Sequence, residues 1–364
     1  MPPVAATSTL AGAVIGGVAP ISGSIVALYR AGATLGGSAQ SLGTSTSDPQ
    51  GRFSIPFTNP GTSAILYLVA SGGDAGHGPN PAIQLALMLG RADTLPSAPV
   101  TVNEVTSVVF GYAMNFFIQA SSDHSISGAS PALDHAAATP ALLVDPVNGA
   151  VKASLDANAQ SMINGLADIL ASCVGGTPSS CNSLFSAAAP SGGITPENTL
   201  SVLLDLVENP TGNVSTLWGL IGSSPPYPTT STIPSMVALA LNFAGGALFN
   251  GPSGIAVDGS GNVWVANING DSVTEIPKGV TSCASSSCPI FSGAFDVPRG
   301  IAVDGSGNVW VANINGDSVT EIPKGVTSCA SSSCRSSAGP LAGLRGSRWT
   351  VPGTSGSPTT SVTA

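Results

Sequence analysis

Apolar and polar residues alternate in short runs along the first hundred residues of the chain. Such alternation occurs in residues 22–32 and 51–57, and residues 63–73 form an apolar run bounded by glycines. Residues 47–51, between two of these runs, contain the turn-forming sequence Ser-Asp-Pro-Gln-Gly. Alternation places every second side chain on one face of a strand, and short strands with frequent turns are typical of a β-sandwich. We therefore predict a β-sandwich over residues 1–100.

Residues 101–222 change to a helical period. Val105, Val108 and Val109 recur at a spacing of three to four residues, and residues 162–170 carry a second apolar stripe with the same period. Thr101 and Glu104 have the spacing of a capping box, which predicts that the first helix begins at Thr101. We predict a helical domain over residues 101–222, followed by a Pro- and Ser-rich linker at residues 223–235.

One sequence of 35 residues stands twice in the chain, at residues 254–288 and again, without a difference, at residues 300–334. Each copy alternates between short apolar strands and Asp-, Gly- and Asn-rich turns, and residues 289–295 supply a fourth strand after the first copy. A four-stranded unit that recurs every 40 to 50 residues is the signature of a β-propeller blade. We predict two blades over residues 236–334, and thus a multi-domain α+β chain.

The repeat sequence P-x-G-I-A-V-D-G-S-G-N-V-W-V-A-N resembles the NHL-repeat β-propellers, which are similar to propellers of the streptogramin-lyase type. The strands of the first eighty residues resemble the carboxypeptidase-regulatory-like, transthyretin-like sandwich. That second resemblance implies an accessory domain without catalytic residues. Propellers have at least four blades, so the family resemblance implies a protein that is truncated at its C-terminus and continues beyond residue 364.

The resemblance to the lyases also implies a histidine in the propeller that acts as general base. The three histidines of the chain, His77, His124 and His135, all precede the repeat. We therefore expect a binding or scaffold protein without catalytic activity of its own. The alternative is a fragment of a propeller lyase or hydrolase that lacks its catalytic blade.

The repeat pattern ends after Cys334. Trp349 has the single codon TGG, and the codon of Thr350 begins with AC. A shifted reading that joins the last base of the first codon to the first two of the second gives GAC, which encodes Asp. Asp304 stands at the corresponding position one repeat earlier. One hypothesis is that residues 335–364 are the frame-shifted reading of another blade, and resequencing of the gene would test it. The alternative is a natural Ser-, Thr- and Gly-rich disordered tail. Both hypotheses predict a tail without stable structure.

Composition narrows the choice of partners and compartment. Charged residues make up 8 % of the chain, where about 25 % is usual, and the net charge is −9. Nucleic acid is excluded as a partner because the chain has no basic stripe. No apolar run is long enough to span a membrane, and no signal peptide is visible, so we expect any export signal to lie outside this chain. A surface of Ser, Thr, Asn and Gly favours an extracytoplasmic protein.

The six cysteines form three local pairs, Cys173 with Cys181, Cys283 with Cys288, and Cys329 with Cys334. Even pairing favours disulfides and an oxidising compartment. The alternative is a four-thiolate zinc site made by the last two pairs, although such sites space their cysteines more closely. His124 and His135 lie near acidic residues, but we interpret them as loop residues. We predict no metal and no cofactor.

The densest hydrogen-bonding side chains of the repeat fall in its second turn and at the crossing between the copies. We predict that they lie together on one face and bind the ligand, because loops on a rigid scaffold often carry recognition. The alternative is that they only shape turns. The partner is expected to be a protein, a glycan or another cell-surface ligand. The predicted binding residues are Asn267, Asn269, Asp271, Arg299, Asn313, Asn315 and Asp317.

Overall fold

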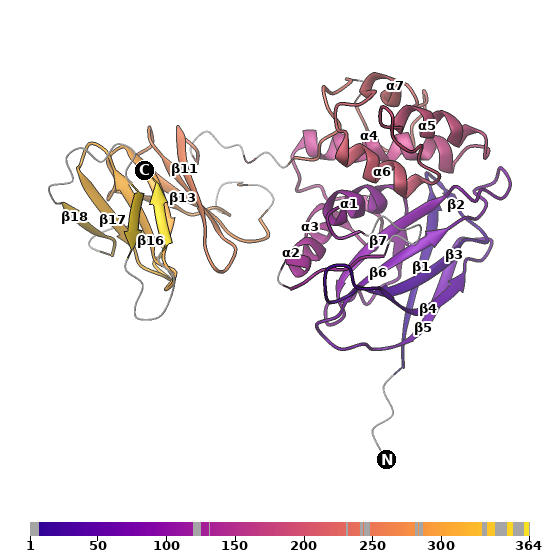
Figure 1. Ribbon diagram of the computed structural model, residues 1–364, viewed down its shortest axis with the longest axis horizontal. Helices are drawn as coiled ribbons and strands as arrows, with labels where there is room; N and C mark the ends of the chain where they lie inside the picture. The colour runs from indigo at the N-terminus through magenta and orange to yellow at the C-terminus, as the bar shows by residue number, and fades with distance from the viewer. Residues whose placement is uncertain are drawn as a thin grey trace, which may run out of the picture. The chain divides into compact units, whose positions relative to one another are not determined.

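The computed structural model describes residues 7–118, 125–130, 132–230, 232–240, 243, 248–280, 283, 287–329, 333–338, 348–351 and 360–363. The chain divides into two compact units, residues 1–241 and 242–364, which are described separately below (Figure 1). Its architecture is mixed α+β, as the sequence predicts. Among the helices of the described residues, none combines the length and the apolar character that crossing a membrane requires.

Two four-stranded sheets form the sandwich of the first unit. One has the order β2-β1-β5, with β8 pairing in parallel with β1, and the other has the order β4-β3-β6-β7. The strands are β1 (Thr7–Gly16), β2 (Ala19–Pro20), β3 (Ile25–Arg30), β4 (Gln40–Thr46), β5 (Arg52–Thr58), β6 (Ile65–Ser71), β7 (Gln84–Arg91) and β8 (Val100–Val102).

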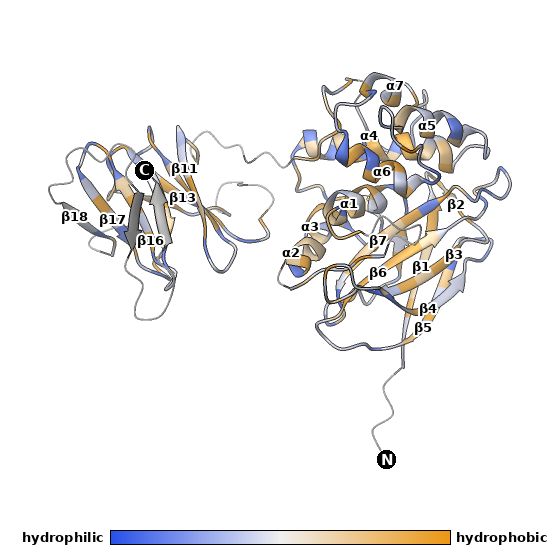
Figure 2. Ribbon diagram, in the orientation of Figure 1, coloured by the Kyte–Doolittle hydropathy of each residue, from blue (hydrophilic) through white to orange (hydrophobic). Residues whose placement is uncertain are grey.

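The alternation of apolar residues explains how the two sheets pack. Phe53, Ile55 and Phe57 of β5 are buried, and the residues between them are exposed. Their side chains share a core with residues of the other sheet, such as Leu28 and Leu68. Figure 2 shows the apolar residues concentrated along the strands of this sandwich. The alternating pattern thus assigns one face of β5 to the core and the other to solvent.

Seven helices among the described residues complete the first unit, and a short hairpin lies between them. The helices are α1 (Glu104–Met114), α2 (Ala132–Ala138), α3 (Pro140–Leu143), α4 (Ala157–Val174), α5 (Ser180–Ala188), α6 (Thr199–Glu208) and α7 (Val214–Trp218). The hairpin consists of β9 (Val144–Asp145) and β10 (Ala150–Val151).

Helix α1 joins the sandwich to the other helices. Tyr67 of β6 and Phe110 of α1 have ring centroids 5.8 Å apart, and both belong to one core that extends to Ile163 and Leu166 of α4. Strand β6 is therefore covered on both faces, which explains why its residues are buried almost without interruption. The shared core makes the sandwich and the helices one compact unit.

The start of α1 differs from the prediction. The capping residue is Asn103, whose Oδ1 accepts a hydrogen bond from the Thr106 amide at 3.0 Å, while the Thr106 hydroxyl accepts one from the Asn103 amide at 3.0 Å. The predicted capping box of Thr101 and Glu104 was wrong, because Thr101 belongs to β8 and its hydroxyl donates to the Val147 carbonyl at 2.7 Å. Glu104 is therefore the first residue of the helix, and its side chain is buried.

The second unit contains two four-stranded antiparallel sheets, each formed by one copy of the repeat and the strand that follows it. The first sheet has the order β11-β12-β13-β14 and the second has the order β15-β16-β17-β18, which confirms the predicted four-stranded units. The strands are β11 (Pro252–Val257), β12 (Val263–Asn267), β13 (Ser272–Ile276), β14 (Ile290–Ser292), β15 (Pro298–Val303), β16 (Val309–Asn313), β17 (Ser318–Ile322) and β18 (Arg335–Ala338).

The two sheets pack face to face. Trp264 and Phe291 of the first sheet have ring centroids 5.3 Å apart and share a core with Ile301 and Val311 of the second sheet. This arrangement is like that of neighbouring propeller blades, in which each sheet covers a face of the next.

The described residues of the tail include short strands. Strand β18 pairs with β17, Arg335 lies 3.6 Å from Glu321, and the hydroxyls of Ser336 and Thr320 are 2.8 Å apart. Backbone hydrogen bonds hold an edge strand, so the small residues that replace the first copy's sequence still fit there. Strands β19 (Arg348–Val351) and β20 (Thr360–Thr363) form a further hairpin. The other tail residues lie outside the described residues.

All three predicted cysteine pairs form disulfides. Cys173 is bonded to Cys181, at the end of α4 and the start of α5, and the repeat contains the bonds Cys283–Cys288 and Cys329–Cys334. The described residues contain no free cysteine. Each bond closes a short loop, and together they support an oxidising compartment.

Candidate functional site

The predicted binding residues of the repeat separate into a buried pair and an exposed set. Asn267 is 0 % exposed and Asn313 is 5 % exposed, and each lies at the end of the second strand of its sheet. Asn267 Nδ2 donates to Thr274 Oγ1 at 2.9 Å, and Asn313 Nδ2 donates to Thr320 Oγ1 at the same distance. These amides hold the second and third strands of each sheet together, so their side chains are not displayed to a ligand.

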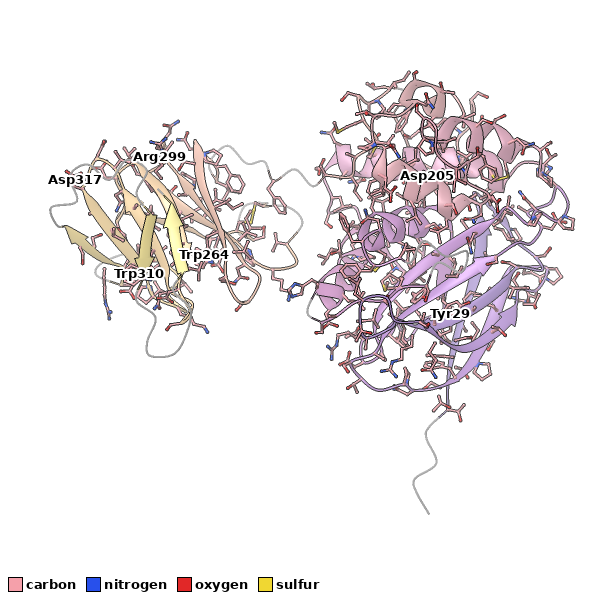
Figure 3. The ribbon with its side chains drawn as sticks, viewed as in Figure 1. Tyr29, Asp205, Trp264, Arg299, Trp310 and Asp317 are labelled. Atoms are coloured by element: carbon pink, nitrogen blue, oxygen red, sulfur yellow. A yellow bond between two sulfur atoms is a disulfide. The ribbon has the colours of Figure 1, made fainter. Side chains whose placement is uncertain are left out.

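The other five predicted residues are exposed at the ends of strands or in the turns that follow. Asp271 and Asp317 occupy corresponding turn positions with φ of 42° and 38°, a left-handed conformation that Asp tolerates better than most residues. Figure 3 shows Arg299 and Asp317 at the same end of the second unit. The exposed set consists of Asn269, Asp271, Arg299, Asn315 and Asp317.

Among the described residues, four members of the exposed set have no side-chain hydrogen bond. The exception is Asp271, whose Oδ1 accepts from the Val297 amide at 2.7 Å and so fastens the second turn of the first copy to the segment that enters the second copy. The set combines amides, two carboxylates and one guanidinium. Such a group has both donors and acceptors to offer a polar ligand.

The acidic residue in the first turn of each copy holds the turn itself, unlike most of the exposed set. Asp258 accepts hydrogen bonds from the Trp264 indole at 3.1 Å and from the Asn262 amide at 3.0 Å, and Asp304 accepts equivalent bonds from Trp310 and Asn308, both at 2.9 Å. Partial burial opposes ionisation of both carboxyls, but these hydrogen bonds outweigh it and lower their pKa. Every strong acceptor position is used within the turn, so we assign these residues to turn formation.

The sequence reasoning missed a pair of buried carboxyls in the first unit. Glu104 is 0 % exposed and accepts hydrogen bonds from the Gly17 amide at 2.9 Å and the Tyr227 hydroxyl at 2.6 Å. Burial raises the pKa of Glu104 to about 7. Asp168 is 3 % exposed and accepts from the Tyr227 amide at 3.0 Å, and burial raises its pKa to about 6.

Tyr227 thus connects the two carboxyls to the segment that was predicted to be a linker. Asn164 Nδ2 donates to the Pro228 carbonyl at 2.7 Å and the Thr229 hydroxyl donates to the Ser161 carbonyl at 3.3 Å, so this segment lies along α4. The only sequence signal for this arrangement is an acidic residue in the apolar stripe of each helix. At Glu104 the signal is weak, because acidic residues are common in the first turn of a helix.

The two histidines that the structure describes do not lie in a cluster of possible metal ligands. His77 and His135 are exposed, and His124 lies outside the described residues. Within the part of the chain that the structure describes, no group of three His, Cys, Asp or Glu side chains has the geometry of a metal site.

Comparisons with known proteins give only a partial likeness. No known family profile matches the chain, and no curated protein matches it. A streptogramin B lyase structure is 18 % identical over 25 % of this chain and 27 % of that chain, with a TM-score of 0.20. The virginiamycin B lyase of Staphylococcus aureus is 17 % identical over 25 % of this chain and 28 % of that chain, with a TM-score of 0.18.

A third structure aligns over most of both chains. The PQQ-bound aldose sugar dehydrogenase of Streptomyces coelicolor is 11 % identical over 96 % of this chain and 90 % of that chain, with a TM-score of 0.20. The chain spans little more than a quarter of the length of the two lyases. At these TM-scores the likenesses carry no argument about chemistry, and the proposals below rest on the geometry of the chain itself.

Proposed function

We propose that the chain is an extracytoplasmic binding or scaffold protein whose repeat sheets are NHL-type propeller blades, without catalytic activity of its own. The observation that carries the proposal is the exposed set at the ends of the repeat strands. Two identical turns present Asp271 and Asp317 on neighbouring sheets, and Arg299 lies at the start of β15, the first strand of the second sheet. Rigid scaffolds with polar loops commonly serve recognition.

The buried asparagines support this surface. Asn267 and Asn313 fix the strand ends from which the turns project, and the left-handed Asp271 and Asp317 then fix the course of each turn. Preorganised loops lose little conformational entropy on binding. We therefore narrow the proposed ligand contacts to Asn269, Asp271, Arg299, Asn315 and Asp317.

Two further features support an extracytoplasmic location and a partner other than nucleic acid. The three disulfides suit an oxidising compartment. The net charge of −9 and the low content of charged residues disfavour nucleic acid and favour a protein, a glycan or another cell-surface ligand. The sandwich would then serve as an accessory module of the carboxypeptidase-regulatory-like type.

The reading as a fragment of a propeller lyase or hydrolase has less support. No histidine follows His135, so the repeat lacks the residue type that most often acts as general base. The intact chain should also be assayed for catalytic turnover of the ligand that it binds, and we expect no turnover.

The test uses conservative variants of the exposed set. The intact chain is measured by biolayer interferometry against immobilised extracellular proteins and glycans, and the tightest ligand is kept. Asp271→Asn and Asp317→Asn remove charge from positions where Asn tolerates the left-handed backbone, and Arg299→Gln removes the guanidinium. We expect each to weaken binding by about tenfold, which corresponds to the loss of one charged hydrogen bond.

The matched control is Glu197→Gln, an exposed carboxyl of the first unit. It changes the net charge by the same amount as the aspartate variants and should leave affinity unchanged. Equal affinity for all four variants and the parent chain would contradict the proposed surface.

A further inference from the structure

The first unit contains a cavity of about 630 Å³. Its walls come from the end of β1, the hairpin β9–β10, the first turns of α4 and residues 227–230. Ligand sites of small molecules typically have volumes of about 300 to 1,000 Å³, so the cavity has the size of a small-molecule site. None of the residues that line it is Asp, Glu, Lys, Arg or His.

Three side-chain amides bring unpaired polar atoms to this cavity. Asn164 is 8 % exposed and donates through Nδ2 to the Pro228 carbonyl at 2.7 Å, and its Oδ1 has no partner among the described residues. Gln160 donates through Nε2 to the Leu155 carbonyl at 2.6 Å, which leaves its Oε1 without a described partner. Asn148 accepts from the Ala150 amide through Oδ1 at 3.0 Å, which leaves its Nδ2 as a donor.

The wall formed by residues 227–230 is held by hydrogen bonds to the neighbouring elements. The Thr230 amide donates to the Ser161 hydroxyl at 3.2 Å, and Tyr227 is anchored through its hydroxyl to Glu104 and through its amide to Asp168. The cavity is therefore formed before any ligand arrives, and a ligand would not have to order residues 227–230. Preorganisation of this kind increases affinity.

The residues that line the cavity exclude several chemical classes of ligand. A cation would need carboxylate ligands, and an anion would need basic side chains, and neither type lines the cavity. A wholly apolar ligand would leave the three amides without partners at a cost in free energy. Amide oxygens and an amide N–H, beside the partly exposed apolar side chains of Ile15 and Val151, instead suit a ligand with many hydroxyl groups and no charge.

We propose that this cavity binds a neutral carbohydrate of one or two sugar units. The site lies in the first unit and is independent of the function proposed for the repeat. Its amides contact the sugar hydroxyls, and the apolar wall covers the C–H face of the ring.

The experiment titrates the intact chain with glucose, galactose, mannose, N-acetylglucosamine, maltose, cellobiose, glucuronic acid and glucosamine by isothermal titration calorimetry. We expect saturable binding of at least one neutral sugar, and weaker binding of glucuronic acid and glucosamine. Gln160→Met preserves the size of the side chain and removes its oxygen, and it should weaken that binding by about tenfold.

A second pair of variants controls for folding. Ala150→Trp places a large side chain in the lining and should abolish binding, whereas Ala153→Trp adds the same side chain at an exposed position outside the lining and should not. Absence of saturable binding by every neutral sugar at 10 mM, about the weakest affinity that would be useful, would overturn the proposal. Unchanged affinity in both Gln160→Met and Ala150→Trp would overturn it as well.

Discussion

The two copies of the repeat have the same sequence over 35 residues, yet the same side chains have different surroundings. Ile255 of β11 is 70 % exposed, whereas its counterpart Ile301 of β15 is 7 % exposed. Ile301 is buried because the second sheet packs against Trp264 of the first. Among the described residues, no sheet covers β11 in the same way. Burial within a repeat is thus decided by the neighbouring sheet and not by the local sequence.

The fourth strand shows a difference that does come from the sequence. Phe291 of β14 is 0 % exposed and packs on Trp264, whereas the corresponding residue of β18 is the exposed Ser337. Both strands pair with the third strand of their sheet. Backbone pairing therefore survives the change of sequence, and the aromatic contact does not.

The largest predicted effect follows from this difference. Phe291→Ala should lower the free energy of unfolding of the second unit by about 3 to 5 kcal/mol, because it opens a cavity beneath Trp264. The counterpart Ser337→Ala should change it by no more than about 0.5 kcal/mol. Urea unfolding followed by hydrogen exchange and mass spectrometry measures both. Similar losses in the two variants would contradict the assigned environments.

A smaller loss of stability is expected at the buried asparagines, which make the same hydrogen bond in both copies. Asn267→Ala and Asn313→Ala should each lower the free energy of unfolding of the second unit by about 1 to 3 kcal/mol, because each leaves a buried threonine hydroxyl short of a donor. The same urea experiment applies, and the two losses should agree within about 1 kcal/mol. Wild-type stability in either variant would show that these amides do not hold the strands together.

The smallest predicted effect is a difference in how pH changes the stability of the two units. It arises from the turn carboxyls of the repeat and from Glu104 of the first unit. The pKa of Asp258 and that of Asp304 are lowered, so their contribution to stability is present above the ordinary carboxyl pKa and is lost as the pH falls through the lowered value. The pKa of Glu104 is raised to about 7, so its contribution is present at low pH and is lost as the pH rises towards 7.

Acidification should therefore weaken the second unit and strengthen the first. Hydrogen exchange at urea concentrations near the midpoint, measured from pH 3 to pH 8, reports the two units separately. Glu104→Gln should reduce the slope of the first unit's profile between about pH 4.5 and 7, part of which remains because burial also raises the pKa of Asp168 to about 6, and it should leave the second unit unchanged. Parallel profiles for the two units in the parent chain would contradict the assigned surroundings of these carboxyls.

Much of this fold could be predicted from the sequence. Alternation identified the buried faces of strands such as β5, repetition identified the four-stranded sheets, and local cysteine pairs identified the disulfides. These features depend on residues that are close in the chain. The burial of Glu104 could not be predicted, since it depends on Gly17 and Tyr227, which lie far away in the sequence.

Only part of the candidate site could be predicted, because some of its features depend on local sequence and others on contacts between distant residues. The turn positions of Asp271 and Asp317 follow from local turn signals, and the structure places both in exposed turns. The burial of Asn267 and Asn313 depends on contacts across strands, with Thr274 and Thr320, and on the segments that precede each sheet. A list of hydrogen-bonding residues cannot distinguish the side chains that hold a turn from those that face solvent.

The stacking of the two sheets as neighbouring blades is the central claim, because it places the two polar turns on adjoining sheets. Ile255→Ala and Ile301→Ala test it most directly, since the substituted residues have identical sequence neighbours on the C-terminal side and differ only in their surroundings. Urea unfolding of the second unit should show a loss of about 2 to 4 kcal/mol for Ile301→Ala and less than about 1 kcal/mol for Ile255→Ala. Equal losses in the two variants would contradict the stacking.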